Sequence, residues 1–191
     1  MVKADLAGAR RLTRWLSPAG LFLAGLLLLL PFVAVSCDAP GGYGRGSAGS
    51  TTTYTGADLV TGDEPAVSPP DQVLPPERRR DDTLGVRPLA VTVLVLILAA
   101  LITATGIATP WRRRLVTAIL AATAALTLVA EQVAVRSVLA ARLRDQLTTP
   151  LPADKRVEDY VQTQPGFWLC LLTLIAVAAA NSAALLRGRR P

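Results

Sequence analysis

A run of 20 residues without a single charge, from Pro18 to Cys37, constrains this chain more than any other feature. A helix rises about 1.5 Å per residue, so a helix of that length would be roughly 30 Å long, which matches the hydrocarbon core of a bilayer. Three arginines closely precede the run and an aspartate follows it. Because basic residues are retained on the cytoplasmic side, the pattern predicts a membrane-spanning helix with a cytoplasmic amino terminus. Pro31 would kink this helix, since proline lacks a backbone hydrogen-bond donor.

The distribution of the apolar residues matters more than their number. They make up 51% of the chain, an ordinary fraction, but they are gathered into four runs instead of alternating with polar residues as in a soluble domain. The net charge is +6, and many arginines lie beside the apolar runs, where the positive-inside rule places them. We therefore expect the lipid bilayer as a partner and no nucleic acid. Histidine is absent and the two cysteines are far apart, so no cofactor or metal site is expected.

The hydropathy pattern predicts an all-α integral membrane protein, an antiparallel four-helix transmembrane bundle with an extracytoplasmic cap made of a loop and a helix. Short arginine-rich segments at the inner ends of the helices predict a multi-pass plasma-membrane protein with both termini in the cytoplasm. The predicted segments are a cytoplasmic segment 1–17, transmembrane spans 18–37, 88–108, 115–135 and 165–186, extracytoplasmic loops 38–87 and 148–164, a cytoplasmic turn 109–114, an amphipathic extension 136–147 and a cytoplasmic tail 187–191.

The extension is predicted because apolar residues continue at helical spacing beyond the third span, among charged residues. Its apolar stripe would lie either on the lipid headgroups or under the first outer loop. Glu131 and Gln132 lie near the outer end of the same span. A charge costs about 2.5–3.5 kcal/mol at mid-bilayer and less near the interface. Glu131 is therefore either a hydrated interfacial carboxylate near Arg136 or part of a polar intramembrane site for a proton or cation.

The first outer loop, 38–87, is rich in glycine, serine, threonine and proline, and it has few apolar residues with which to bury a core alone. The β-forming run Thr51–Thr55 can pair with another short strand. The most patterned piece of the loop contains Tyr54, Gly56, Asp58 and Gly62, with glycines where tight turns are expected. This piece is either a small ordered turn over the helix ends or an interaction loop for a partner or ligand. The run Arg78–Asp82 balances its own charge and is expected to pair with itself.

The two cysteines have several possible fates. The residues before Cys37 loosely resemble a bacterial lipobox, which would be cleaved to leave a lipidated Cys37 at the amino terminus. Cys37 and Cys170 are both placed toward the outer leaflet, where a disulfide is chemically allowed. Because Cys170 lies more than one turn inside the fourth span, two separate buried thiols are the other interpretation.

The chain combines four predicted membrane crossings with three short motifs, Val35–Cys37, Tyr54–Leu59 and Pro165–Leu169. Together they resemble small four-helix membrane proteins of high-GC Gram-positive (actinobacterial-type) bacteria, to which no activity is attached. The arginine-rich and alanine-rich composition agrees with such a genome. The layout is also similar to that of claudin-like proteins, but the tryptophan and paired cysteines of their first loop are missing, so only the topology is comparable.

Three function classes remain after these exclusions. The first is a non-enzymatic envelope or accessory protein that interacts with another membrane or envelope protein. The second is a small channel, transporter or transporter subunit that uses Glu131 and Gln132. The third is a membrane enzyme that uses loop carboxylates such as Asp58, Asp63 or Glu64. No catalytic dyad, phosphate-binding loop or nucleotide motif is visible, so the first class is favoured and no enzyme is expected.

Overall fold

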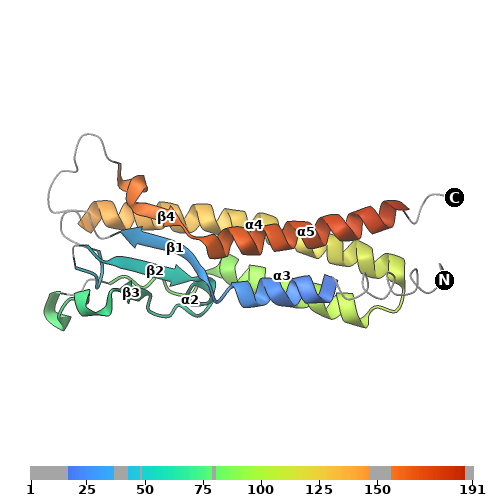
Figure 1. The fold of residues 1–191 in the computed structure, drawn as a ribbon, viewed down its shortest axis with the longest axis horizontal. Helices are drawn as coiled ribbons and strands as arrows, with labels where there is room; N and C mark the ends of the chain where they lie inside the picture. Colours follow the sequence, from blue (N-terminus) through green and yellow to red (C-terminus); the bar gives the residue numbers. More distant parts are fainter. Residues whose placement is uncertain (1–16, 37–42, 48, 79–80, 147–155, 188–191) are drawn as a thin grey trace, which may run out of the picture.

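The computed structural model describes residues 17–36, 43–47, 49–78, 81–146 and 156–187. Four helices lie side by side and a small sheet covers one end of them, as Figure 1 shows. The helices are Ser17–Leu27, α3 (Pro88–Gly106), α4 (Pro110–Gln146) and α5 (Pro165–Arg187). Residues 17 and 187, where the described chain begins and ends, lie at the end of the bundle remote from the sheet.

Three of these helices are long and apolar enough to cross a membrane, namely α3, α4 and α5. They contain most of the predicted spans 88–108, 115–135 and 165–186. Each begins with a proline, which suits a helix's first turn because the first backbone donors have no intrahelical partner. The helix Ser17–Leu27 has 11 described residues and is shorter than a membrane crossing requires.

Apolar side chains fill the space between the four helices. The buried cluster draws on all of them and includes Leu21, Ala24, Val93, Ile97, Ala100, Ala121, Ala124, Leu128, Leu174 and Val177. Alanine is frequent in this core, and small side chains let helix backbones approach closely. Large apolar side chains such as Phe22, Ile102, Leu126 and Leu172 are exposed on the outward faces. Helices that are apolar both inside and outside are typical of proteins whose solvent is lipid.

The prediction of one helix over residues 18–37 is wrong. The first helix ends at Leu27, a turn follows, and Pro31–Ser36 form the strand β1. Proline cannot supply the donor that a continuing helix needs, and the β-branched Val33 and Val35 suit a strand. Residues 32–35 are all buried. Phe32 belongs to the apolar cluster of the helices, whereas Val33 and Val35 belong to a second cluster formed with the sheet, so the uncharged run records two different apolar environments and not one.

The chain is mostly helical, as predicted, but a four-stranded antiparallel sheet means that it is not all-α. Its strand order is β3-β2-β1-β4, with β2 at Thr51–Thr55, β3 at Ala66–Ser68 and β4 at Val161–Thr163. The strand predicted at residues 51–55 is confirmed. Strand β1 lies between β2 and β4, which come from the two polar stretches of the sequence. Residues from both predicted outer loops therefore build one sheet.

The helix α4 continues beyond the bundle core, as the sequence pattern predicts. Its last turns place Val135, Leu139 and Leu143, all fully buried, in a second apolar cluster with the sheet and α2 (Gly56–Thr61). The apolar stripe thus lies against the sheet and α2 and not on lipid headgroups. We use "the cap" for the sheet, α2, the described residues between 43 and 87, and the part of α4 after residue 134.

The predicted cytoplasmic turn 109–114 is shorter than expected. Because α4 begins at Pro110, only residues 107–109 are non-helical. Arg112, Arg113 and Arg114 therefore lie in the first turns of α4. Arg114 Nη1 reaches the Ala184 carbonyl oxygen near the end of α5 at 3.5 Å, where a positive charge is favourable for the helix dipole.

Candidate functional site

The junction between bundle and cap contains a buried ion pair. Glu131 is 3% exposed, and its Oε1 accepts a hydrogen bond from Arg87 Nε at 3.1 Å. Arg87 is positioned as the residue that precedes α3, and its backbone N–H donates to the Leu59 carbonyl at 2.9 Å. The expectation of a hydrated carboxylate near Arg136 is therefore wrong in both burial and partner. The pair is internally neutral, which lowers the cost of placing Glu131 beside the apolar core.

A small cavity adjoins this pair. It has about 10 Å³ of free space, and Glu131 and Gln132 line it together with apolar residues such as Leu28, Phe32 and Leu128. Among the described residues, Glu131 Oε2 has no hydrogen-bond partner. That volume holds about one water molecule, which Oε2 can bind. Gln132 Nε2 donates to Thr163 Oγ1 at 3.0 Å and so connects α4 to β4.

The residues of the predicted interaction loop have structural roles within the cap. Asp58 and Thr55 cap α2 reciprocally, with Thr55 N to Asp58 Oδ2 at 2.7 Å and Asp58 N to Thr55 Oγ1 at 3.1 Å. Gly62 ends α2 in the left-handed conformation with φ of 78°. Gly56 lies so close to the turn after the first helix that a Cβ there would come within 2.8 Å of the Leu28 carbonyl oxygen. Together these contacts form an ordered turn over the helix ends.

Tyr54 is buried in the centre of the cap. Its hydroxyl donates to the Asp82 carbonyl oxygen at 2.6 Å and lies 3.2 Å from the Tyr43 hydroxyl. Burial, with a smaller contribution from Tyr43, raises the pKa of the Tyr54 phenol above its ordinary value. The phenol therefore stays neutral and acts as a structural hydrogen-bond donor.

Arg45 organises the polar side of the cap and was not singled out from the sequence. It donates from Nε to Asp82 Oδ2 at 3.1 Å and from Nη2 to the Pro65 carbonyl at 2.6 Å, and it also pairs with Glu64. Burial lowers the pKa of Arg45. The hydrogen bonds and charge interactions with Asp82 and Glu64 together raise this pKa by more than burial lowers it, so the net shift is upward. Asp82 is thus paired with a residue 37 positions away. No local sequence pattern signals such a long-range pair. Residues 79 and 80 of its charged run lie outside the described residues, so the predicted pairing within Arg78–Asp82 stays a prediction.

The carboxylates considered for catalysis point to separate structural partners. Asp58 caps α2, Asp63 accepts from the Thr61 hydroxyl at 2.6 Å, and Glu64 pairs with Arg45. Within the described ranges, no group of three or more histidine, cysteine, aspartate or glutamate residues is arranged to hold a metal ion. General acid–base work requires groups that converge on one point, and these three do not.

Cys170 is a free, fully buried thiol, and its Sγ lies 3.6 Å from the Ala24 carbonyl oxygen. Cys170 therefore forms no disulfide. Cys37 lies outside the described residues, and its lipidation stays a prediction. Cleavage before Cys37 would remove the whole of β1, which is hydrogen-bonded to β2 on one side and to β4 on the other.

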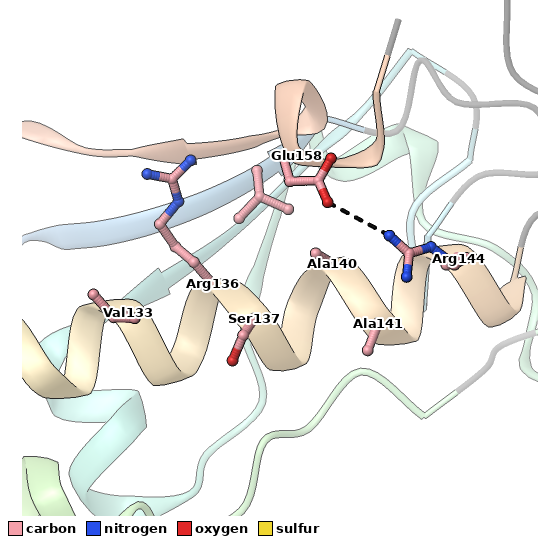
Figure 2. Close-up of a pocket in the computed structure, with 8 residues that line it drawn as sticks. Val133, Arg136, Ser137, Ala140, Ala141, Arg144 and Glu158 are labelled. Atoms are coloured by element: carbon pink, nitrogen blue, oxygen red, sulfur yellow. Dashed lines mark hydrogen bonds and ion pairs between the residues drawn. The ribbon is translucent and has the colours of Figure 1, made fainter.

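A groove beside the sheet is a further candidate that the sequence did not reveal. It has a volume of about 410 Å³ and lies between the part of α4 from Val133 to Arg144 and the segment containing the 3₁₀ turn η3 (Val157–Tyr160) and β4. Figure 2 shows Arg136 at one end and the Arg144–Glu158 ion pair, at 3.5 Å, toward the other. Its charged groups come from segments 14 to 22 residues apart, so spacing alone could not bring them together.

Comparisons with protein-family models, with curated proteins and with solved structures find no match to this chain. The inferences that follow therefore rest on its own residues and geometry.

Proposed function

We propose that this chain is a multi-pass plasma-membrane protein with both termini in the cytoplasm and the cap outside. Three apolar helices of spanning length support membrane insertion. The helix Ser17–Leu27 belongs to the same core. Its 11 described residues are shorter than a crossing, so we propose that the first crossing combines this helix with the residues that flank it, including the turn into β1. The basic residues Arg112–Arg114 lie at the end opposite the cap, which favours a cytoplasmic location for that end.

We further propose that the cap serves as a non-enzymatic interaction surface for another membrane or envelope protein. The observation that carries this proposal is the continuity of α4. At about 1.5 Å per residue, its 37 residues extend about 55 Å and belong to both apolar cores. The cap is thus attached to the bundle through a helix and not through a flexible linker. A rigid, membrane-anchored surface needs little ordering on binding, which favours recognition of a partner.

Cysteine accessibility tests the orientation. In a background without native cysteines, one cysteine replaces Val86, which is exposed in the cap, and another replaces Trp111, which is exposed at the opposite end. A membrane-impermeant maleimide is expected to label Val86→Cys in intact cells and Trp111→Cys only after permeabilisation. The reverse pattern would overturn the proposed orientation.

Photo-crosslinking in native membranes tests the interaction. A photoreactive residue at Val86 is expected to capture a stoichiometric protein partner, whereas the same residue at lipid-facing Leu126 is expected to capture lipid. Absence of a protein adduct at Val86 and at other exposed cap positions, together with ion conduction by the purified monomer in liposomes, would replace this proposal with the channel alternative.

A further inference from the structure

We propose that the groove beside α4 binds the phosphate of an anionic membrane phospholipid through Arg136. This inference rests on the proposed membrane insertion, but not on the proposed protein partner. The groove is bounded by Val133, Arg136, Ala140, Arg144, Glu158 and Val161. It therefore combines an apolar wall with charged groups, as a lipid headgroup site requires.

Arg136 differs from the two other arginines in the outer part of α4. Arg142 donates to the Thr83 carbonyl oxygen at 2.7 Å, and Arg144 pairs with Glu158 at 3.5 Å. Within the described part of the chain, the guanidinium of Arg136 makes no hydrogen bond or ion pair. Because Arg144 neutralises Glu158, the three charged groups of the groove leave a net charge of +1 at Arg136. A guanidinium is well suited to bind phosphate oxygens in a bidentate manner.

The position of Arg136 corresponds to the headgroup layer. Gln132 is hydrogen-bonded to Thr163, which comes just before α5, and the exposed Trp168 lies about one turn further along that helix. Tryptophan prefers the membrane interface, and the headgroup layer beyond it is about 5–8 Å thick. At about 1.5 Å per residue, Arg136 starts about 6 Å beyond Gln132, which is itself about one turn, or about 5 Å, beyond Trp168. The Cα of Arg136 thus lies about 11 Å beyond the level of Trp168, and its side chain must turn back to reach the headgroup layer. Its side chain leans back toward Val133, as Figure 2 shows, because helical side chains tilt toward the helix amino terminus.

An apolar track leads from the bundle into the groove and favours a lipid over a soluble phosphate. Leu126, Val129 and Val133 are exposed, by 73%, 40% and 64%, and their spacing places them on one face of α4. Ala140, on the same face, continues the track along the groove. An acyl chain can therefore lie along this face while its phosphate contacts Arg136. A free phosphate ion would make no use of such a track.

Native mass spectrometry of the full chain, released from detergent with added phosphatidylglycerol or phosphatidylcholine, tests this site. We expect preferential retention of phosphatidylglycerol and about a tenfold loss of that retention in Arg136→Gln, since one charge-assisted contact is removed. Glu158→Gln is expected to increase retention, because it removes a negative charge from the groove. Arg156→Gln removes an exposed charge just before η3 that does not line the groove, so it is the matched control and is expected to bind like the wild type.

Equal retention by wild type and Arg136→Gln would overturn the proposal. So would an equal loss in Arg156→Gln, because it would indicate diffuse attraction to the cap. Displacement of the lipid by soluble glycerol phosphate would assign the groove to a soluble phosphate compound, and a co-purified protein that blocks lipid retention would assign it to a protein interface. These measurements do not depend on membrane orientation, so their failure and a failure of the cysteine-labelling test are distinguishable.

Discussion

Arg87 and Glu131 form a buried ion pair, with 3.1 Å between Nε and Oε1, at the level where the cap meets the bundle. Arg87 leads into α3 and Glu131 lies within α4, so the pair joins the cap end of α3 to the interior of α4, 15 residues before that helix ends. The two partners are unequally buried, because the Arg87 side chain is 20% exposed and the Glu131 side chain only 3%. This asymmetry predicts unequal effects of removing either charge.

Arg87→Gln is expected to destabilise the protein by about 3–5 kcal/mol, because it leaves a buried carboxylate without its partner. Glu131→Gln is expected to cost less, about 1–2 kcal/mol, since the released guanidinium can reach water. The double variant is expected to be more stable than Arg87→Gln alone. Thermal unfolding in detergent measures all three, and equal losses in the two single variants would contradict the assigned burial.

Alanine substitutions of two glycines test the position of β1, the strand found where the second half of the first helix was predicted. Gly166 lies against the start of β1, where an added Cβ would be 2.3 Å from the Pro31 carbonyl oxygen. Gly25, in the first helix, has no atom within 4 Å of an added Cβ. Gly166→Ala is therefore expected to lower the melting temperature, because a backbone oxygen cannot move aside easily. Gly25→Ala is expected to leave the melting temperature unchanged or to raise it, because alanine favours a helix more than glycine does, by about 0.5–1 kcal/mol of free energy.

The two variants together separate a steric effect from a general intolerance of alanine. If Gly166→Ala is as stable as the wild type, the close approach of α5 to the turn before β1 is wrong. Expression level and monodispersity in detergent serve as the control for misfolding during insertion.

The helices α3, α4 and α5 were predictable from the sequence because hydropathy acts locally. Pro88 and Pro165 begin α3 and α5 at the predicted boundaries, whereas α4 begins at Pro110, five residues before the predicted span 115–135. The strand β1 was not predictable in the same way. Val33 and Val35 are buried in the apolar cluster of the cap and Phe32 in that of the helices, and burial inside a protein and burial in lipid leave the same apolar signature in a sequence.

The candidate sites were harder to predict than the elements that carry them. Glu131 was identified from its type and depth, but its partner Arg87 is 44 positions away and appeared to belong to a loop. Arg45 and Asp82 are similarly separated by 37 positions. Each of these pairs depends on how the chain folds in three dimensions, and no spacing rule encodes that arrangement. The patterned turn around Asp58 was visible because its capping box is local.

Mass spectrometry tests the state of both cysteines. After denaturation without reductant, Cys170 is expected to react fully with iodoacetamide, because it is a free thiol, whereas in the folded protein it is expected to be protected by burial. A peptide that contains both Ser36 and Cys37 is expected, because β1 is part of the sheet and must remain attached. A diacylated amino-terminal Cys37 would contradict this and would establish lipoprotein processing.

Tyr54 predicts how the cap responds to alkali. Burial raises the pKa of its phenol in the folded state, whereas the unfolded chain ionises near the ordinary value of about 10. The unfolded state therefore loses its proton first, so the stabilising contribution is complete below about pH 10 and falls as the pH rises above that value. The difference in absorbance at 295 nm between wild type and Tyr54→Phe, recorded with circular dichroism, follows this phenol alone. We expect it to ionise only together with unfolding of the cap. Reversible ionisation near pH 10 with an intact sheet would show that Tyr54 is accessible to water and that the Tyr54–Asp82 hydrogen bond does not hold the cap together.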